Sequence, residues 1–491
     1  MALAELAPET RNLIDGRLVP ASNGNTFENV NPATEEVLGV VADGTKDDMD
    51  RAVAAARRAF DQTGWSTDPE LRARCIRQLH QGMVEAKEQL RSIVVHEAGA
   101  PVSLTGFMHV DDPIGMLPYW ADKATSYPYE QCMSDVPFGG RPQRRILRRE
   151  AMGVVGAITP WNVPLYLNIA KIGASLASGC TVVLKPAPDT PWSATSIGRI
   201  AAEKTDLPPG VLNVVASSDH LVGEVLSTDP RIDLVSFTGS TATGRRVMEC
   251  ASATLKKVFL ELGGKSATIV LDDANLEAAL PAAAMTCVHG GQGCAITTRW
   301  LVPRRHYARA LEILKAAFEG WRYGDPRDPS VLQGPQVSRR QQERVLAYIE
   351  TGKREGARCL VGGGRPRHLP KGFFVEPTLF VDVDPRATIA QEEIFGPVLC
   401  VIPYGDDDDA VRIANDSAYG LSGAVVGANE ERALSVARRI RTGTISVNGG
   451  MWFHVDTPFG GYKQSGVGRE NGLAGFEEHL ETKVIALPGK A

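Results

Sequence analysis

From residue 153 onward the chain alternates short, apolar, β-rich runs with segments of helical periodicity, and this alternation constrains the fold more than any other feature. Runs of this kind are typical of parallel strands that are covered by helices on both faces. The sequence therefore predicts an α/β fold with a doubly wound sheet. The expected strands are 153–159, 181–185, 211–216, 233–239 and 257–262, and the expected helices are 164–178 (ended by Gly179), 193–203, 221–226 and 241–251.

A second series of the same kind follows, and it predicts a second α/β domain. A chain of 491 residues is too long for one core, since domains average roughly 150 residues. The expected strands here are 266–271, 298–302, 398–404, 421–426 and 444–449, the expected helices are 276–289 and 307–321, the acidic run 406–409 begins a further helix, and glycine turns lie at 362–364 and 460–461.

Two pieces of the chain fit neither series. Residues 129–151 are rich in arginine, and the tail from about 478 to 487 alternates like a strand. Leftover strands often pair with a second subunit, so we expect a small β oligomerisation flap. The predicted division is one domain from 1–128 and 152–262, a second from 263–465, and a flap from 129–151 and 466–491.

Charge and cysteine content exclude several classes of protein. Lys and Arg total 53 against 58 Asp and Glu, a net charge of −5, so no basic field favours nucleic acid or anionic lipid. The first residues lack the pattern of a signal peptide, and no apolar run is long enough to cross a membrane, so we expect a cytoplasmic protein. The eight cysteines form no CxxC pair, which predicts free thiols and no metal site.

Cys294 is the cysteine most suited to chemistry. It lies in HGGQGCAITTR, where three glycines clear side-chain bulk from around one thiol. A packed core residue is the usual fate of a free cysteine, and we accept it for Cys287 and the others. At Cys294 the glycines favour a nucleophile that can meet a substrate.

Glu261 and Asn162 each follow an expected strand. Glu261 ends an otherwise apolar run, where a carboxylate is costly without a partner or a task. An ion pair and a general base are both compatible with it, and the position beyond a strand end, where open α/β sheets bind ligands, favours the base. Asn162 precedes a helix, so it could stabilise an oxyanion or cap that helix; spacing does not separate the two.

Two further strand ends could contact a nucleotide. The turn FTGSTATG (237–244) leads from a strand into a helix, and its free N–H groups suit a phosphate, although it is not the usual G-x-G-x-x-G. Lys185, in LKPAPDTP, follows another strand on the same edge and could meet a ribose or a phosphate; a solvated lysine is the plainer alternative.

Together these segments resemble the aldehyde dehydrogenase family over almost the whole chain. No single motif decides this, but their number and order make coincidence implausible. The matching motifs are PWN (160–162), KIG (171–173), KPA (185–187), FTGS (237–240), ELGGK (261–265), GQGC (291–294), EEIFGP (392–397) and PFGGYKQSGVGRE (458–470).

The resemblance implies roles for these residues. Cys294 would be the nucleophile, Glu261 the base that activates water for hydrolysis of a thioester, and Asn162 with the N–H of Cys294 the oxyanion hole. Lys171 and Glu470 match a proton relay, with a structural salt bridge as the alternative. Glu261 argues against transfer of the acyl group to coenzyme A, which needs no activated water.

The resemblance also implies that the first domain is a Rossmann-like dinucleotide-binding domain and the second the catalytic one. Lys185 would bind the adenosine ribose, Ser240 the pyrophosphate, and Glu393 with Phe395 the nicotinamide side. Pro188 stands where many NAD-preferring relatives have glutamate, so NADP is possible, but the absence of an extra cation near Lys185 favours NAD. The remaining expected contacts are Thr159, Pro160, Trp161, Gly239 and Leu262.

The residues that match the substrate tunnel are apolar and several are small. They predict a hydrophobic aliphatic, aromatic or terpenoid aldehyde, since no cation is present to pair with a second carboxylate. A betaine, amino-aldehyde or semialdehyde dehydrogenase, a cysteine esterase and a non-catalytic binding protein are the alternatives, and a homodimer or homotetramer is expected. The tunnel residues are Val163, Leu167, Ala170, Gly293, Ala295, Trp452 and Phe453.

Overall fold

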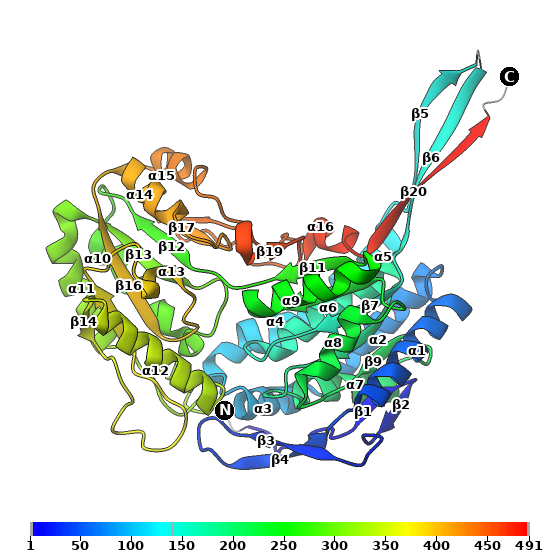
Figure 1. Ribbon diagram of the computed structural model, residues 1–491, viewed down its shortest axis with the longest axis horizontal. Coiled ribbons are helices and arrows are strands. Elements are labelled where there is room, and N and C mark those ends of the chain that lie inside the picture. Colours follow the sequence, from blue (N-terminus) through cyan, green and yellow to red (C-terminus); the bar gives the residue numbers. More distant parts are fainter. Residues whose placement is uncertain (1–2, 140, 489–491) are drawn as a thin grey trace.

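The computed structural model describes residues 3–139 and 141–488, which form two α/β bodies and a narrow projecting sheet (Figure 1). The predicted α/β class is confirmed, because two mainly parallel sheets organise the bodies. Residues 1–2, 140 and 489–491, which the sequence assigned to the first domain and the flap, lie outside the described part of the chain. Within these described ranges, no helix is both long and apolar enough to cross a membrane.

The first sheet has the strand order β19-β11-β10-β7-β8-β9-β1-β2 in the described residues. Its central five strands are parallel, as predicted, whereas β1, β2 and β19 pair antiparallel at the two ends. The bounds are β1 (Asn12–Ile14), β2 (Arg17–Val19), β7 (Val154–Ile158), β8 (Thr181–Lys185), β9 (Leu212–Val214), β10 (Leu234–Thr238), β11 (Lys257–Glu261) and β19 (Gly466–Val467).

Helices cover both faces of this sheet, and successive side chains of a strand are buried on opposite faces. In β8, Val182 and Leu184 pack in one cluster with α2, α5, α6 and α7, while Val183 packs in another with α1, α8 and α9. The strands are therefore apolar on both sides. The helices are α1 (Lys46–Gln62), α2 (Pro69–Glu85), α3 (Lys87–Glu97), α4 (Asp111–Gly115), α5 (Leu117–Ser126), α6 (Pro164–Ser178), α7 (Trp192–Lys204), α8 (His220–Thr228), α9 (Thr241–Ala251) and α16 (Gly472–Glu477), with short helical turns at η1 (Val102–Leu104), η2 (Thr105–His109), a π-helix, and η3 (Ser252–Thr254).

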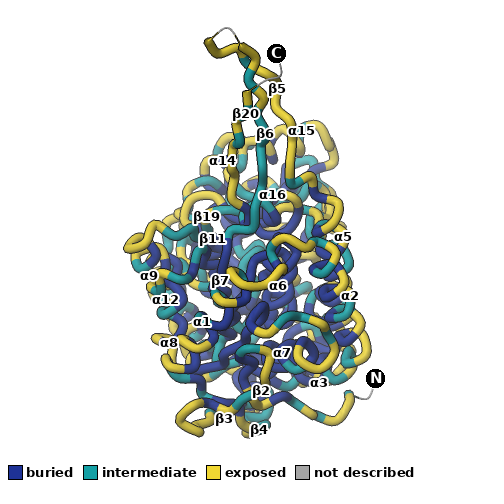
Figure 2. The backbone as a smooth tube through the Cα atoms, turned by 90° about the vertical axis from the view of Figure 1, so that its right-hand side faces the viewer, coloured by how far each residue is buried: buried dark blue, intermediate teal, exposed yellow. Residues whose placement is uncertain are grey.

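Helix α6 lies in the middle of this body and is buried along its whole length (Figure 2). It begins with Pro164, whose fixed φ suits the first helical position, and ends at Gly179, whose φ of 97° makes a left-handed cap. Both bounds agree with the prediction. A helix fixed at both ends gives a stable support for the residues that precede it.

The second sheet has the order β14-β15-β16-β13-β12-β17-β18 in the described residues, parallel except for β14. One face packs against α12 to α15 and the other against α11 and η4. The strands are β12 (Ser266–Val270), β13 (Thr297–Pro303), β14 (Arg358–Val361), β15 (Thr378–Val381), β16 (Val398–Tyr404), β17 (Gly423–Val426) and β18 (Ser446–Val447); the helices are α10 (Leu276–Ala279), η4 (Leu280–Gly291), η5 (Arg304–His306), α11 (Tyr307–Glu319), α12 (Arg339–Arg354), α13 (Thr388–Gln391), α14 (Asp407–Asn415), α15 (Glu430–Ala437) and η6 (Lys463–Ser465).

The helix expected over 276–289 is interrupted. It forms one α-helical turn, α10, and then short 3₁₀ turns merged as η4, with a kink at Val288 to Gly290. Pro281 lacks the N–H that an α-helix would need to continue, and His289 adopts a left-handed backbone with φ of 50°. The prediction of a continuous helix is therefore wrong, and the interruption redirects the chain toward Cys294.

The projecting sheet has the order β20-β6-β5 and is composed of β5 (Glu130–Phe138), β6 (Arg141–Ala151) and β20 (Leu480–Pro488). It leaves the body as an exposed arm (Figures 1 and 2), as expected for 129–151 and the tail strand. The start of the flap at 466 needs correction. β19 pairs with β11 and α16 packs against α6, because Phe476 is fully buried in the first body.

Separately, β3 (Thr26–Val30) and β4 (Val37–Ala42) form a hairpin.

Candidate active site

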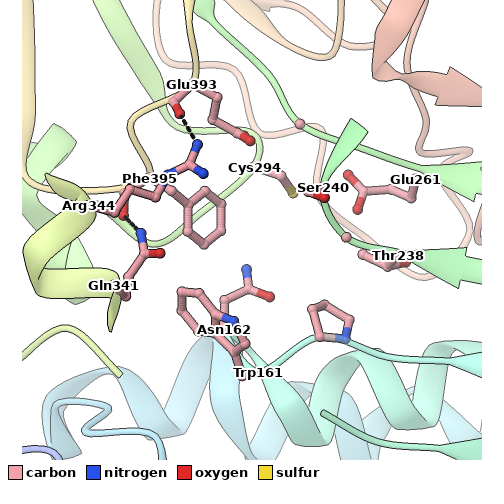
Figure 3. Close-up of a pocket in the computed structure, with 13 residues that line it drawn as sticks. Trp161, Asn162, Thr238, Ser240, Glu261, Cys294, Gln341, Arg344, Glu393 and Phe395 are labelled. Carbon is pink, nitrogen blue, oxygen red and sulfur yellow. Dashed lines mark hydrogen bonds between the residues drawn. The ribbon is translucent and has the colours of Figure 1, made fainter. Parts of the chain in front are cut away.

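A cavity of about 170 Å³ lies between the two bodies, and it contains three of the residues that the sequence singled out for chemistry: Cys294, Glu261 and Asn162. They come from the end of β11, the turn after β7 and the loop before β13, so strand ends of both sheets contribute. Figure 3 shows the side chains around one open space. The other lining residues are Pro160, Trp161, Thr238, Gly239, Ser240, Gly263, Gln341, Arg344, Glu393 and Phe395.

Glu261 is the last residue of β11 and is only 1% exposed. Neither carboxylate oxygen has a hydrogen-bond partner among the described residues. Burial raises the pKa of this carboxyl well above its usual range; Glu470 adds to the increase, while the Cys294 thiol and the Lys171 ammonium act against it. A carboxyl in this setting can exchange a proton near neutral pH.

Cys294 follows the kinked segment η4 and is partly exposed. The enclosed position of its sulfur and the nearby carboxyl of Glu261 raise the pKa of the thiol well above its usual range, with the backbone N–H of Ala295 acting in the opposite direction. Cysteine reacts as a nucleophile through its thiolate, whereas the protein surroundings of Cys294 favour the thiol. The charged groups that act on the sulfur, Glu261 and Glu393, are carboxylates, and they add to the effect of burial.

Close backbone contact fixes the loop that carries Cys294. Gly291 has φ of 70°, and a Cβ atom there would lie 2.1 Å from the carbonyl oxygen of Gly396. Gln292 is held by three bonds: its Nε2 donates to the carbonyl oxygens of His289 (3.0 Å) and Pro335 (3.2 Å), and its Oε1 accepts from the N–H of Val337 (2.9 Å). The glycines of this motif are therefore needed for backbone approach as well as for access.

Asn162 lies beside this loop and is 5% exposed. Its Nδ2 donates to the carbonyl oxygen of Gln292 at 3.0 Å. A primary amide has two donor hydrogens, so one remains for a ligand in the cavity. The side chain does not cap α6, for which no side-chain cap bond is present at the described start of the helix.

Lys171 and Glu470 form a buried ion pair behind Glu261. Lys171 Nζ lies 3.3 Å from Glu470 Oε1 and 3.1 Å from Ser236 Oγ, and the two charged side chains are 0% and 5% exposed. Both act on the Glu261 carboxyl through charge. The sequence left a salt bridge and a proton relay as alternatives for these two residues. The structure has the ion pair, and its charges also act on Glu261, so the geometry is compatible with both.

Two of the residues expected to bind a dinucleotide, Ser240 and Lys185, lie at carboxyl ends of strands in the first sheet. Ser240 is the N-cap of α9, with its Oγ accepting from the N–H of Thr243 at 3.2 Å, so the free N–H groups of this helix open on the cavity. Lys185 ends β8, donates to the carbonyl oxygen of Ser217 at 3.2 Å, and has its pKa lowered to about 8 by burial. A helix N-terminus and a buried cation at the ends of β10 and β8, the two strands that flank β7, fit a dinucleotide.

The nicotinamide end predicted from the sequence also has a defined arrangement. Glu393 Oε1 accepts from the N–H of Gly264 at 2.9 Å, and the ring of Phe395 packs edge-on against Trp161 with centroids 5.4 Å apart. Pro160 and Gly239 line the cavity. Thr159 and Leu262 are next in sequence to residues that line the cavity, but both are buried and neither lines it.

Four cavity residues were given no role by the sequence reasoning: Thr238 and Gly263, which lie within the FTGS and ELGGK motifs, and Gln341 and Arg344 on α12. Gln341 Nε2 donates to the carbonyl oxygen of Phe395 at 2.9 Å, and Arg344 donates to that of Glu393 at 2.9 Å (Figure 3). No motif marks them, because α12 has an ordinary amphipathic pattern. Their spacing of three residues on one helix face was the available signal.

The expected tunnel residues do not line this cavity. Those on and before α6 are buried in the first core, and Phe453 packs against the same core. Aromatic rings gather around Phe453: Tyr166 lies 5.2 Å away, Trp452 5.9 Å and Phe107 6.2 Å between centroids. Phe107 was not predicted. The tunnel residues are Val163, Leu167, Ala170, Gly293, Ala295, Trp452 and Phe453.

Residues 18–485 match the model of the aldehyde dehydrogenase family. The chain belongs to the aldehyde dehydrogenase family. Among its relatives, a 3-succinoylsemialdehyde-pyridine dehydrogenase from a Pseudomonas species is 42% identical over 476 residues, covering 96% of this chain and 97% of the relative.

Solved aldehyde dehydrogenase structures share the whole fold. Aldehyde dehydrogenase C from Pseudomonas syringae, a mutant solved with NAD⁺ and octanal, has a TM-score of 0.92 at 42% identity and covers 98% of each chain. The Mycobacterium tuberculosis aldehyde dehydrogenase with NAD⁺ has a TM-score of 0.94 at 41% identity and covers 99% of each chain. The family resemblance of the motifs is thereby confirmed.

Proposed function

We propose that this aldehyde dehydrogenase oxidises a hydrophobic aldehyde to the carboxylic acid with NAD⁺, using Cys294 as nucleophile. The observation that carries the proposal is that Cys294, Glu261 and Asn162, distant in the chain, line one cavity with the N-terminus of α9. Relatives that bind NAD⁺ at 41–42% identity support the choice of cofactor. NADP⁺ is the alternative cofactor, because Pro188 stands where many NAD-preferring relatives have a glutamate.

The chemistry begins at the sulfur. The thiol of Cys294 releases its proton to solvent water, and the thiolate adds to the aldehyde carbon to give a tetrahedral oxyanion. The free hydrogen of Asn162 Nδ2 and the backbone N–H of Cys294 stabilise that oxygen. NAD⁺, when bound, supplies the acceptor for the hydride that leaves carbon. The thioester on Cys294 remains.

Hydrolysis then releases the product. Glu261 accepts a proton from water as the water oxygen attacks the thioester carbon, and the C–S bond then breaks to release the carboxylic acid and leave Cys294 as the thiolate. The raised pKa of Glu261 suits this exchange. Lys171 and Glu470, buried behind Glu261, are proposed to pass that proton onward.

The substrate class follows from the tunnel residues and from one relative. The seven positions are apolar, and the octanal bound by the Pseudomonas syringae enzyme has the same character. A kcat/KM ranking of hexanal, octanal, benzaldehyde, betaine aldehyde and succinic semialdehyde tests this. First place for either charged substrate would contradict it; the 3-succinoylsemialdehyde-pyridine dehydrogenase makes a semialdehyde the second candidate.

We also propose a homodimer or homotetramer built through the flap, and a cytoplasmic location. Both outer strands of the flap, β5 and β20, have a free edge within the described residues, and Phe138 and Val484 are exposed on it. The division into a dinucleotide-binding domain, a catalytic domain and a flap is proposed on the same basis. Light scattering of the whole chain, against a variant lacking the tail strand, tests the assembly.

A further inference from the structure

Two buried histidines behind the site have no place in the chemistry above. His289, in the loop before Cys294, and His109, at the end of η2, are 3% and 0% exposed. Their rings meet edge to face with centroids 4.5 Å apart. Burial lowers the pKa of His289 to about 4 and that of His109 well below its usual value, so both rings are neutral.

His289 makes one side-chain hydrogen bond, and it reaches Asn162. Its Nε2 lies 2.7 Å from the backbone carbonyl oxygen of Asn162, so the neutral ring carries its hydrogen on Nε2 and donates it. Its Nδ1 has no partner among the described residues. Asn162 Nδ2 in turn donates to Gln292, three residues beyond His289. Two bonds thus tie Asn162 to the loop of the nucleophile.

The backbone at His289 is unfavourable for a histidine. Its φ of 50° and ψ of 36° lie in the left-handed region, which glycine or asparagine adopts more easily. The N–H of His289 donates to the carbonyl oxygen of Leu332 at 2.8 Å, which fixes this conformation. A strained conformation that aims a buried ring at one carbonyl points to a role for that ring.

We propose that His289 is a positioning residue for the oxyanion hole: its imidazole holds Asn162 so that the free amide hydrogen faces the oxygen of the aldehyde that Cys294 attacks. The His109 ring packs edge to face against the imidazole of His289. The inference rests on the proposed role of Asn162. The hydrogen bond from His289 to Asn162 joins the Cys294 loop of the second body to the turn after β7 in the first. This bond forms within the protein and involves no substrate atom.

The test measures the pre-steady-state burst of reduced nicotinamide with saturating NAD⁺ and hexanal. His289→Asn tolerates the left-handed backbone but is too short to reach Asn162, and we expect a burst about tenfold slower, with KM for NAD⁺ unchanged. His289→Gln places a donor at a similar reach and is expected to restore most of the rate. His109→Phe keeps the ring contact and serves as the matched control, with a rate near wild type.

A double-mutant cycle with Asn162→Ala separates positioning from general structural damage. Asn162→Ala alone is expected to slow the burst by about 10²–10³-fold, and adding His289→Asn should then change nothing further. An equal loss in both backgrounds, a normal burst in His289→Asn, or an equal loss in His109→Phe would overturn the proposal. A normal burst in Asn162→Ala would instead refute the oxyanion role itself. If His289→Asn does not fold, His289→Gly, which removes both ring and strain, replaces it in the cycle.

Discussion

Replacing Glu261 with glutamine separates the two halves of the proposed reaction. Both carboxylate oxygens of Glu261 lack hydrogen-bond partners among the described residues, so the isosteric amide breaks no bond of the folded protein. Burial raises the pKa of this carboxyl above its usual 4.5, so the ionised form is disfavoured in the fold. We therefore expect Glu261→Gln to keep or slightly raise Tm at pH 8, where the unfolded chain would carry the charge.

The kinetic effects of this change go in opposite directions at the two steps. The carboxyl raises the pKa of the Cys294 thiol, so its removal favours the thiolate, and the burst of reduced nicotinamide is expected to survive at full amplitude. Hydrolysis loses its base, which is expected to slow steady-state turnover by about 10²–10⁴-fold, or about 2.7–5.4 kcal/mol at 1.36 kcal/mol per tenfold. The ratio of burst rate to turnover should rise accordingly.

Stopped-flow absorbance of the reduced nicotinamide, followed into the steady state, measures both quantities in one experiment. In the wild type, turnover limited by hydrolysis should fall as the pH drops through the raised pKa of Glu261, because the base is then protonated; the glutamine variant should lose this dependence. If the burst disappears in Glu261→Gln, the carboxylate acts before hydride transfer, as the base that deprotonates Cys294, and the assignment above is refuted.

Three further changes test other parts of the site. Cys294→Ala should abolish aldehyde oxidation and the hydrolysis of p-nitrophenyl acetate together, and either activity above background would relocate the nucleophile. Pro188→Glu should raise KM for NADP⁺ by more than about tenfold while sparing KM for NAD⁺, because a carboxylate repels a 2′-phosphate; equal effects would show that this loop does not contact the ribose. Gly291→Ala should lower stability by more than about 2 kcal/mol, because the new Cβ meets the carbonyl of Gly396 and φ is positive; an unchanged urea midpoint would contradict this packing.

The sequence predicts the two sheets well because their signal is local. Alternation of apolar runs and helices, with Gly179 ending α6, locates the parallel strands to within one or two residues, except for β15, which was not predicted. Residues at strand ends, such as Glu261 and Lys185, can be assigned to the ligand-binding edge for the same reason, since parallel strands present their carboxyl ends together.

What the sequence does not show depends on contacts between distant segments. The break at His289 is imposed by Leu332 and by Asn162, neither of which is near it in the chain. Gln341 reaches the cavity only because α12 packs across the second sheet. Residues 466–477 read as part of the flap until the burial of Phe476 attaches them to the first body.

The division of the reactive groups between two sheets has a consequence for newly made chains. Glu261 and Asn162 emerge with the first sheet, whereas Cys294 arrives with the second, so a nascent or half-folded molecule holds an ordinary thiol without the groups that direct it. Under the proposed roles, the complete set of reacting groups therefore comes together only when both halves have docked.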